Sequence, residues 1–287
     1  MKTRLLSLAL VLLLAGCGQS LDYSIDNPTD AAIKLEIDGT AYEIPAQEAR
    51  EISLEPGEHS LRSEQLGEVK FIVYRERQSG LINPTLSDYV IAREIYVTDE
   101  SKLKNFGSFA SRILLDGVEF EGAFEQTHAL FIDKRWKFGV REAFPDNVTG
   151  YDPGNGGNIF SKIFTTRDFI AYFEQRYEMP GYFEQNRPAN APSAAPRQAE
   201  PAPALPSLAP EYERHSTALR ELYAQYLKAT DVGEQERLQK AYFDAQMAYT
   251  SATAMVGSKL PAEANEQANL FVTTLGQAMG TSAMVVR

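Results

Sequence analysis

The stretch that decides the fold is Leu35-Glu36-Ile37-Asp38-Gly39-Thr40-Ala41-Tyr42-Glu43-Ile44. Apolar and polar side chains alternate before and after Asp38-Gly39, as in a strand with one buried face. Asp-Gly suits a two-residue turn, because both central positions of that turn need positive φ. The stretch therefore predicts a β-hairpin and places the N-terminal part of the chain in a β class.

The sequence on the C-terminal side of this hairpin continues the β pattern. Alternating or apolar segments at residues 51–54, 59–61 and 69–74 predict further short strands, and Pro56-Gly57 fits the centre of a type II turn. Strands at this spacing predict a small β-sandwich. The stretch from Ile37-Asp38-Gly39 to Pro56-Gly57-Glu58-His59 also resembles PEGA-like surface β-modules, a resemblance that carries no catalytic residues.

Residues 76–186 predict a β-rich region with one helix. Strands are expected at residues 90–97, 112–115, 118–121, 129–132 and 137–140, with a hairpin turn at Asp116-Gly117 and a polar turn at 133–135. The helix is expected over residues 166–178, started by Thr165 or Thr166 and ended by Pro180-Gly181. Whether residues 17–75 and 76–186 form one domain or two stays open.

Composition changes at residues 187–210, which are mostly proline and alanine. Such a segment tends towards extended polyproline II and cannot bury a core. We expect a disordered linker, with a docking site for a proline-recognising partner as the alternative.

Residues 211–287 predict helices. Asp231 with Glu234 three residues later forms a capping-box-like start, and Pro261 suits the first turn of another helix. The expected fold class is therefore a mainly β, sandwich-like N-terminal region with one helix, a Pro/Ala-rich linker at 187–210, and a helical hairpin or three-helix module at 211–287.

Two helical stretches, residues 245–258 and 267–286, contain no charged side chain. An uncharged helix must be covered by something. The cover is either another part of this chain or a partner protein or second copy, and Gly276-x-x-x-Gly280 would allow close approach of a second helix.

The N-terminus has the parts of an export signal: Lys2 and Arg4, then an apolar run over residues 5–14, then Leu14-Ala15-Gly16-Cys17. The apolar run is too short to span a bilayer. The last four residues resemble the bacterial lipobox. That resemblance implies cleavage after residue 16, a diacylglyceryl group on the Cys17 thiol and acylation of its amine. Two or more acyl chains hold a protein stably on a membrane.

The resemblance also implies a location. Gly18 follows Cys17, whereas an aspartate there tends to retain enteric lipoproteins at the inner membrane, so the outer membrane and its periplasmic face are expected if the source is Gram-negative. A tether as short as residues 18–22 would hold the β region against the membrane. The linker would then let the helices reach outward.

Charge and cysteine content exclude several functions. The formal net charge is −11, and losing Lys2 and Arg4 with residues 1–16 makes it −13. A chain this acidic is repelled by nucleic acid and by anionic lipid head groups. Cys17 is the only cysteine, so lipidation leaves no thiol for a disulfide or for catalysis.

No residue pattern predicts a catalytic site, a cofactor or a metal centre, because the histidines lack ligand spacing and the phosphate, dinucleotide and nucleophile motifs are absent. Three weaker candidates remain, each with an ordinary structural alternative. They are His128 as a site residue, a calcium loop using Asp146, Asn147, Asp152, Asn155 and Asn158, and an anion-binding cluster of Lys134, Arg135, Trp136, Lys137 and Arg141.

These observations predict a non-enzymatic, lipid-anchored envelope protein. Its partners would be the membrane, through the lipid on Cys17, and a protein or a second copy, through the helices. An immunity lipoprotein that neutralises a toxin and a hydrolase of the cell wall or of lipids are the alternatives.

Overall fold

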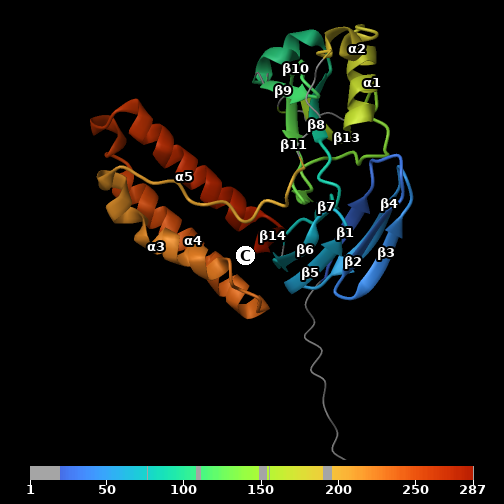
Figure 1. Cartoon of the computed structure of the whole chain (residues 1–287). Coiled ribbons are helices and arrows are strands. Elements are labelled where there is room, and N and C mark those ends of the chain that lie inside the picture. The colour runs from blue at the N-terminus through green and yellow to red at the C-terminus, as the bar shows by residue number, and fades with distance from the viewer. Residues whose placement is uncertain are drawn as a thin grey trace, which may run out of the picture.

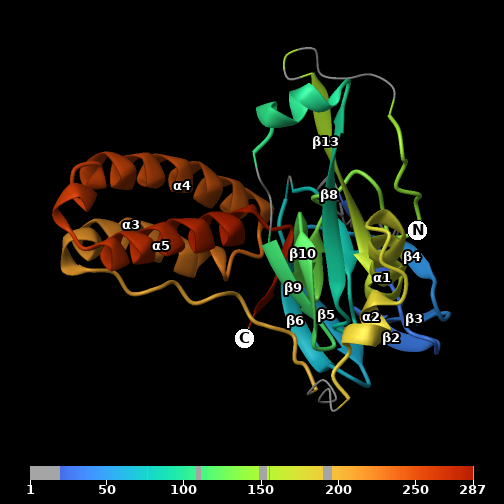
Figure 2. The same cartoon turned by 90° about the horizontal axis from the view of Figure 1, so that it is seen from above.

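The computed structural model describes residues 20–75, 77–107, 111–148, 154, 156–189 and 196–286. Its N-terminal part is mostly β-sheet and its C-terminal part mostly helical, as the sequence predicts. Figures 1 and 2 show the helices projecting together from one side of the β part.

The first β unit consists of two sheets that enclose one core. Strands in the first sheet follow the order β12-β7-β1-β4 and those in the second β14-β6-β5-β2-β3. The first sheet contains β1 (Leu21–Asp26), β4 (Ala49–Leu54), β7 (Gly80–Ile82) and β12 (Phe131–Asp133). The second contains β2 (Ile33–Ile37), β3 (Thr40–Ile44), β5 (Gly57–Ser63), β6 (Gly67–Val73) and β14 (Ala283–Val286).

The β2–β3 hairpin confirms the prediction from Asp38-Gly39. Both residues have positive φ, 49° and 79°, and the two strands pair in antiparallel register from Ile33 opposite Ile44 to Ile37 opposite Thr40. Leu35, Ile37 and Ile44 are buried in the core shared with the first sheet. The turn therefore fixes which face of the hairpin is covered.

The Pro56-Gly57 turn is a different connection from the one predicted. β4 pairs with β1, whereas β5 pairs with β2 and β6, so the chain crosses from one sheet to the other here. Gly57 has φ of +141°, outside the range of a type II turn. A turn motif reports a local bend and does not reveal that the next strand joins another sheet.

The second β unit has a three-stranded sheet in the order β11-β8-β13 and a separate hairpin of β9 and β10. Asp116-Gly117 forms the hairpin turn with φ of 46° and 83°, as predicted. The elements are β8 (Tyr89–Val97), β9 (Ser111–Leu115), β10 (Val118–Gly122), β11 (Phe124–Thr127), β13 (Gly157–Thr165) and a 3₁₀ helix (Glu100–Asn105).

Two helices, α1 (Thr166–Arg176) and α2 (Tyr182–Asn186), pack on this unit through an aromatic core. The side chain of Thr165 caps α1 by accepting a hydrogen bond from the amide of Asp168, so the predicted start of this helix is confirmed. Phe120 lies at the centre, 4.8 Å from the ring of Phe173 and 5.3 Å from that of Phe169.

The strand predicted at residues 137–140 is absent. β12 pairs with β7, and the stretch that follows makes one bridge, between Phe138 and Lys162. The alternation of apolar residues here reflects a loop that packs one side on β13, which periodicity alone cannot distinguish from a strand.

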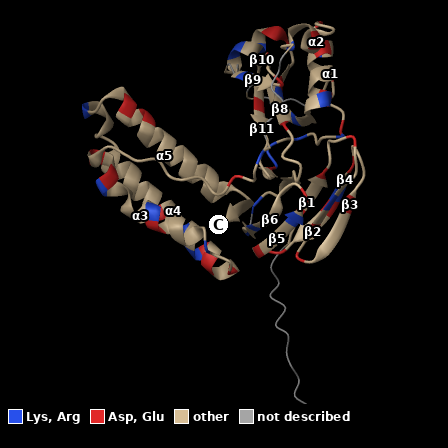
Figure 3. Ribbon diagram, in the orientation of Figure 1, with Lys and Arg blue, Asp and Glu red and all other residues tan. Residues whose placement is uncertain are grey.

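The helical part contains α3 (Pro210–Tyr226), α4 (Val232–Thr253), a short 3₁₀ helix (Gly257–Lys259) and α5 (Ala262–Gly280). Pro210 occupies the first turn of α3, and the Asp231 side chain caps α4 by accepting from the amide of Glu234. Figure 3 shows that α5 carries no charged residue after its first turns. Its apolar face, with Ala268, Phe271 and Leu275, is buried in the helical core.

The last strand joins the helices to the β body. β14, which the sequence did not predict, pairs antiparallel with β6 from Ala283 opposite Val73 to Val286 opposite Lys70. Successive side chains of a strand point to opposite faces. Phe71 and Val73 therefore pack in the sandwich core, while Ile72 and Tyr74 pack in the helical core.

The contacts of residues 196–209 contradict the expectation of a free spacer. The amide of Ala202 donates to the carbonyl of Val285, and the hydroxyl of Tyr223 donates to the carbonyl of Pro203. Leu205 and Leu208 pack against the helical core. A proline-rich chain cannot form a core of its own, but it can lie in extended form against one built by other elements.

None of the helices in the described ranges is long and apolar enough to cross a bilayer.

Gln235 provides a direct test of the junction between the helices and the β body. This side chain is completely buried. It donates to the carbonyls of Val73 and Ala229 and accepts from the amide of Arg75. Gln235→Leu keeps the volume but leaves these backbone groups unpaired, so we expect the free energy of unfolding to fall by about 3 kcal/mol. Urea denaturation measures this loss. The exposed Gln267→Leu is the control, and an equally small change for both variants would contradict the assignment.

Candidate functional site

A cavity of about 690 Å³ lies between the sandwich and the second β unit, next to a cluster of polar side chains. Its wall includes the loop that leads into β8, the start of α1 and the first described residues after the gap at 190–195. Residues that matter for its chemistry are Ser87, Asp88, Thr166, Arg167 and Arg197.

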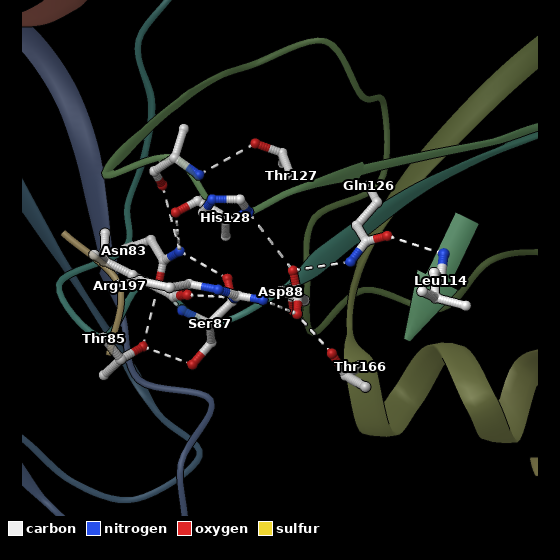
Figure 4. Close-up of polar contacts among 12 residues, drawn as sticks. Asn83, Thr85, Ser87, Asp88, Leu114, Gln126, Thr127, His128, Thr166 and Arg197 are labelled. Atoms are coloured by element: carbon white, nitrogen blue, oxygen red, sulfur yellow. Dashed lines mark hydrogen bonds and ion pairs between the residues drawn. The ribbon is translucent and has the colours of Figure 1, made fainter. Parts of the chain in front are cut away.

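Asn83 shapes the loop beside this cavity. Its side-chain oxygen accepts from the amide of Ser87 and from the hydroxyl of Thr85, while its amide nitrogen donates to the carbonyl of Ser87. Figure 4 shows these side chains drawn towards one another. Asn side chains stabilise tight turns in this way, since they replace backbone partners.

Asp88 is the central acid of the site. Its carboxylate accepts from Arg197 at 2.7 Å and from the side-chain amide of Gln126 at 3.0 Å, and its backbone carbonyl accepts from Thr166. These contacts bring together the loop before β8, strand β11, helix α1 and the Pro/Ala segment (Figure 4). The arrangement pairs the charges of Asp88 and Arg197 and holds the backbone of Asp88 against the start of α1.

Arg197 also holds a strained residue. Leu86 is buried and has φ of 48°, which is uncommon for a residue other than glycine, and its carbonyl accepts from Arg197 at 2.8 Å. Strained backbone persists where its surroundings hold it in place and is frequent at functional sites. Sequence analysis missed this pair because Arg197 lay in a segment expected to be disordered. The available signal was Arg197 itself, one of two arginines in a segment that is mostly proline and alanine.

His128, the histidine singled out from the sequence, lies at the edge of the same cluster. Its side chain is 40% exposed and sits 3.8 Å from both Asp88 and Glu200. Among the residues that the structure describes, no group of three His, Cys, Asp or Glu side chains is arranged to hold a metal ion. His128 therefore contributes to a charge network here.

The calcium candidate falls partly on residues that are not described. Asp152 and Asn155 lie outside the described ranges, while Asn158 belongs to β13. Cys17 and the signal segment 1–16 also lie outside the described residues, so the lipobox prediction stays a prediction.

The basic-aromatic cluster at residues 134–141 divides into paired and accessible members. Arg135 forms an ion pair with Glu125 at 2.6 Å, and Arg141 forms one with the buried carboxylate of Asp26. Lys134 and Lys137 are exposed, and the ammonium of Lys137 lies 4.2 Å from the ring centre of Phe160. Two of the four predicted cations are thus neutralised within the fold.

Trp136 is half-buried against the small apolar cluster that contains Leu81 and Ile163. It lines two neighbouring hollows, of about 620 and about 480 Å³, which also share Asp22, Ser79 and Lys134. Ser20 and Leu21, where the described chain begins, line the first of these hollows.

A buried network fixes this loop. Tyr89 donates its hydroxyl to Asp26 at 2.5 Å, and burial together with the Asp26 charge raises the pKa of that hydroxyl, which keeps it protonated. Lys162 donates to the carbonyls of Gly139 and Val140 at 2.7 and 2.8 Å. Because the ammonium is removed from water, burial lowers the pKa of Lys162 to about 8.

Comparison with protein families, with curated proteins and with solved structures finds no match.

The lowered pKa of Lys162 predicts a pH effect on stability. Unfolded lysine titrates near 10.5, so between pH 8 and 10.5 the unfolded chain binds more protons than the folded one. The cost of burying this charge is fully present below pH 8 and is relieved as pH rises, by up to about 1.4 kcal/mol per pH unit. Compared with Lys162→Met, the wild-type protein should therefore gain free energy of unfolding between about pH 7.5 and pH 9.5. Urea denaturation of both at several pH values checks this, and parallel pH dependences would refute it.

Proposed function

We propose that this protein is a lipid-anchored lipoprotein of the bacterial cell envelope that acts as a binding or assembly module without catalysing a reaction. The observation that carries the proposal is Leu14-Ala15-Gly16-Cys17 behind a short apolar run. The first strand supports it, since β1 begins at Leu21 and leaves only a few residues between the proposed anchor and the β body.

The helices are the proposed contact surface for a protein partner. They project from the β body in Figures 1 and 2, and α4 exposes Phe243 and Met247, one turn apart, at 66% and 55% of their surfaces. Met255 follows at 73% exposure, within a stretch that has no charged residue. Large apolar side chains that are exposed together are typical of protein-binding sites.

Because residues 196–209 contact the helices, the proposed contact surface would be held rigidly on the β body and not on a free arm. The helices are held against the β body by β14 and by this segment, so the anchor would set their orientation as well as that of the sheets. Because Gly18 follows the proposed lipidation site, the proposed location is the outer membrane, on its periplasmic face, if the source is Gram-negative.

Metabolic labelling with a palmitate analogue tests the anchor. We expect the wild-type chain to carry the label and the Cys17→Ser variant to lack it, because the Cys17 sulfur is the proposed attachment atom. Fractionation should then move the variant from the membrane to the soluble fraction. Labelling that survives the substitution would rule out lipidation at this residue.

Photo-crosslinking in intact cells tests the partner surface. A crosslinkable residue at Phe243 or Met247 should capture one defined species, which the same residue at the exposed Lys34 of β2 should not capture. With the crosslinkable residue at Phe243, Met247→Ser should weaken capture of this species without changing the unfolding temperature. Sedimentation of the purified protein distinguishes a second copy from another partner. Equal capture from Lys34, or none from α4, would contradict the assignment of this surface.

A further inference from the structure

One of the two hollows beside Trp136 lies at the first described residues of the chain. Ser20 and Leu21, the first described residues, line the same hollow as Lys134 and Trp136. Three residue steps separate Cys17 from Ser20, so the tether can extend at most about 11 Å. A membrane that holds the lipid on Cys17 must therefore lie close to this surface.

The residues that surround the tether are of the kinds that favour a membrane interface. Tryptophan is enriched at the level of lipid headgroups because its ring is apolar and its N–H is polar. Lysine ammonium groups bind lipid phosphates, and lysine stems can lie along apolar surface while the charge reaches water. Trp136 is half-buried and lies between the exposed residues Arg135 and Lys137, with the exposed Lys134 one position before Arg135.

Acidic residues nearby are partly neutralised within the protein. Asp26 is buried and paired with Arg141, and Glu142 accepts from the amide of Gly139. Asp22, which accepts from the hydroxyl of Ser53, lines both hollows, and Glu51 lines the second. In the hollow nearest the tether, Arg77 and Lys134 face the single carboxylate of Asp22. The lining of this hollow thus has one cation more than carboxylates, in a chain whose net charge is −11, whereas over both hollows four cations match four carboxylates.

The loop is also held in one arrangement, as a binding surface requires. The amides of Lys137 and Phe138 donate to the carbonyl of Ser161, and the hydroxyl of Ser161 donates to the carbonyl of Arg135. Lys162 holds the carbonyls that follow. The backbone on both sides of Trp136 is thus fixed by bonds to β13, and Trp136 lines the same hollow as Ser20.

We propose that Lys134, Trp136 and Lys137 form a phospholipid-binding surface, with the indole among the headgroups and the two ammonium groups on lipid phosphates. The inference rests on the proposed anchor at Cys17. It adds an orientation, since a protein held by acyl chains alone could rotate about its tether. Contact at this surface would fix which side of the β body faces the bilayer and hence where the helices point.

Trp136 is the only tryptophan in the chain, so its fluorescence reports this surface alone. The acylated full-length mature protein is reconstituted into vesicles of phosphatidylethanolamine and phosphatidylglycerol, with and without bromine on acyl carbons near the headgroups. We expect brominated lipid to lower the Trp136 emission about twofold, as for an interfacial indole. Lys134→Glu with Lys137→Glu should remove most of this quenching, and the corresponding glutamine variant should remove part of it.

Lys240→Glu with Lys259→Glu, an equal charge change on exposed positions of the helical part, is the matched control and should leave the quenching unchanged. Thermal unfolding verifies that each variant is folded. Vesicle flotation reports the anchor separately. Protein that does not float would overturn the proposed lipoprotein. Floating protein whose emission is not quenched, or is quenched regardless of the lysine charges, would overturn the headgroup surface alone.

Discussion

The pairing of β14 with β6 is the constraint on which the rest of the structure depends. A strand has two faces, and in β6 both are buried, with Phe71 and Val73 in the sandwich and Ile72 and Tyr74 among the helices. The rings of Tyr74 and Tyr226 stack at 4.1 Å, and the Tyr74 hydroxyl donates to the carbonyl of Tyr226. One strand therefore belongs to two cores, and the helices and the sheets cannot separate without exposing both.

Further contacts reinforce this junction at its two ends. Gln235 satisfies backbone groups of β6 and of the loop before α4 from inside the interface. At the far end, Arg197 binds Asp88, and the segment after it continues along the helices to α3. The Pro/Ala segment connects the second β unit to the helical core. Its prolines favour an extended conformation, which does not require pairing with strands on either side.

The arrangement gives a physical meaning to the short N-terminal tether. If both the proposed anchor and the proposed headgroup surface hold, Trp136 and its neighbouring lysines face the membrane. The exposed apolar side chains of α4 then keep a fixed position relative to the bilayer. Rigid presentation lowers the entropy that a partner must remove on binding. A flexible arm would lack this advantage, although it could search a larger volume.

Local features were determined by the sequence alone. Asp38-Gly39 and Asp116-Gly117 specify their hairpins, and Thr165 and Asp231 specify helix starts, because each depends on residues within a few positions. The lipobox is likewise a local signal. Tertiary structure alone decided that Pro56-Gly57 crosses between sheets, that residues 137–140 form a loop, that the Pro/Ala segment is held, and that the last residues complete a sheet. It also brought Asp88 to Arg197 and Trp136 to Ser20. These outcomes depend on which buried surfaces meet across long stretches of chain, and a pattern read along the sequence does not contain that information.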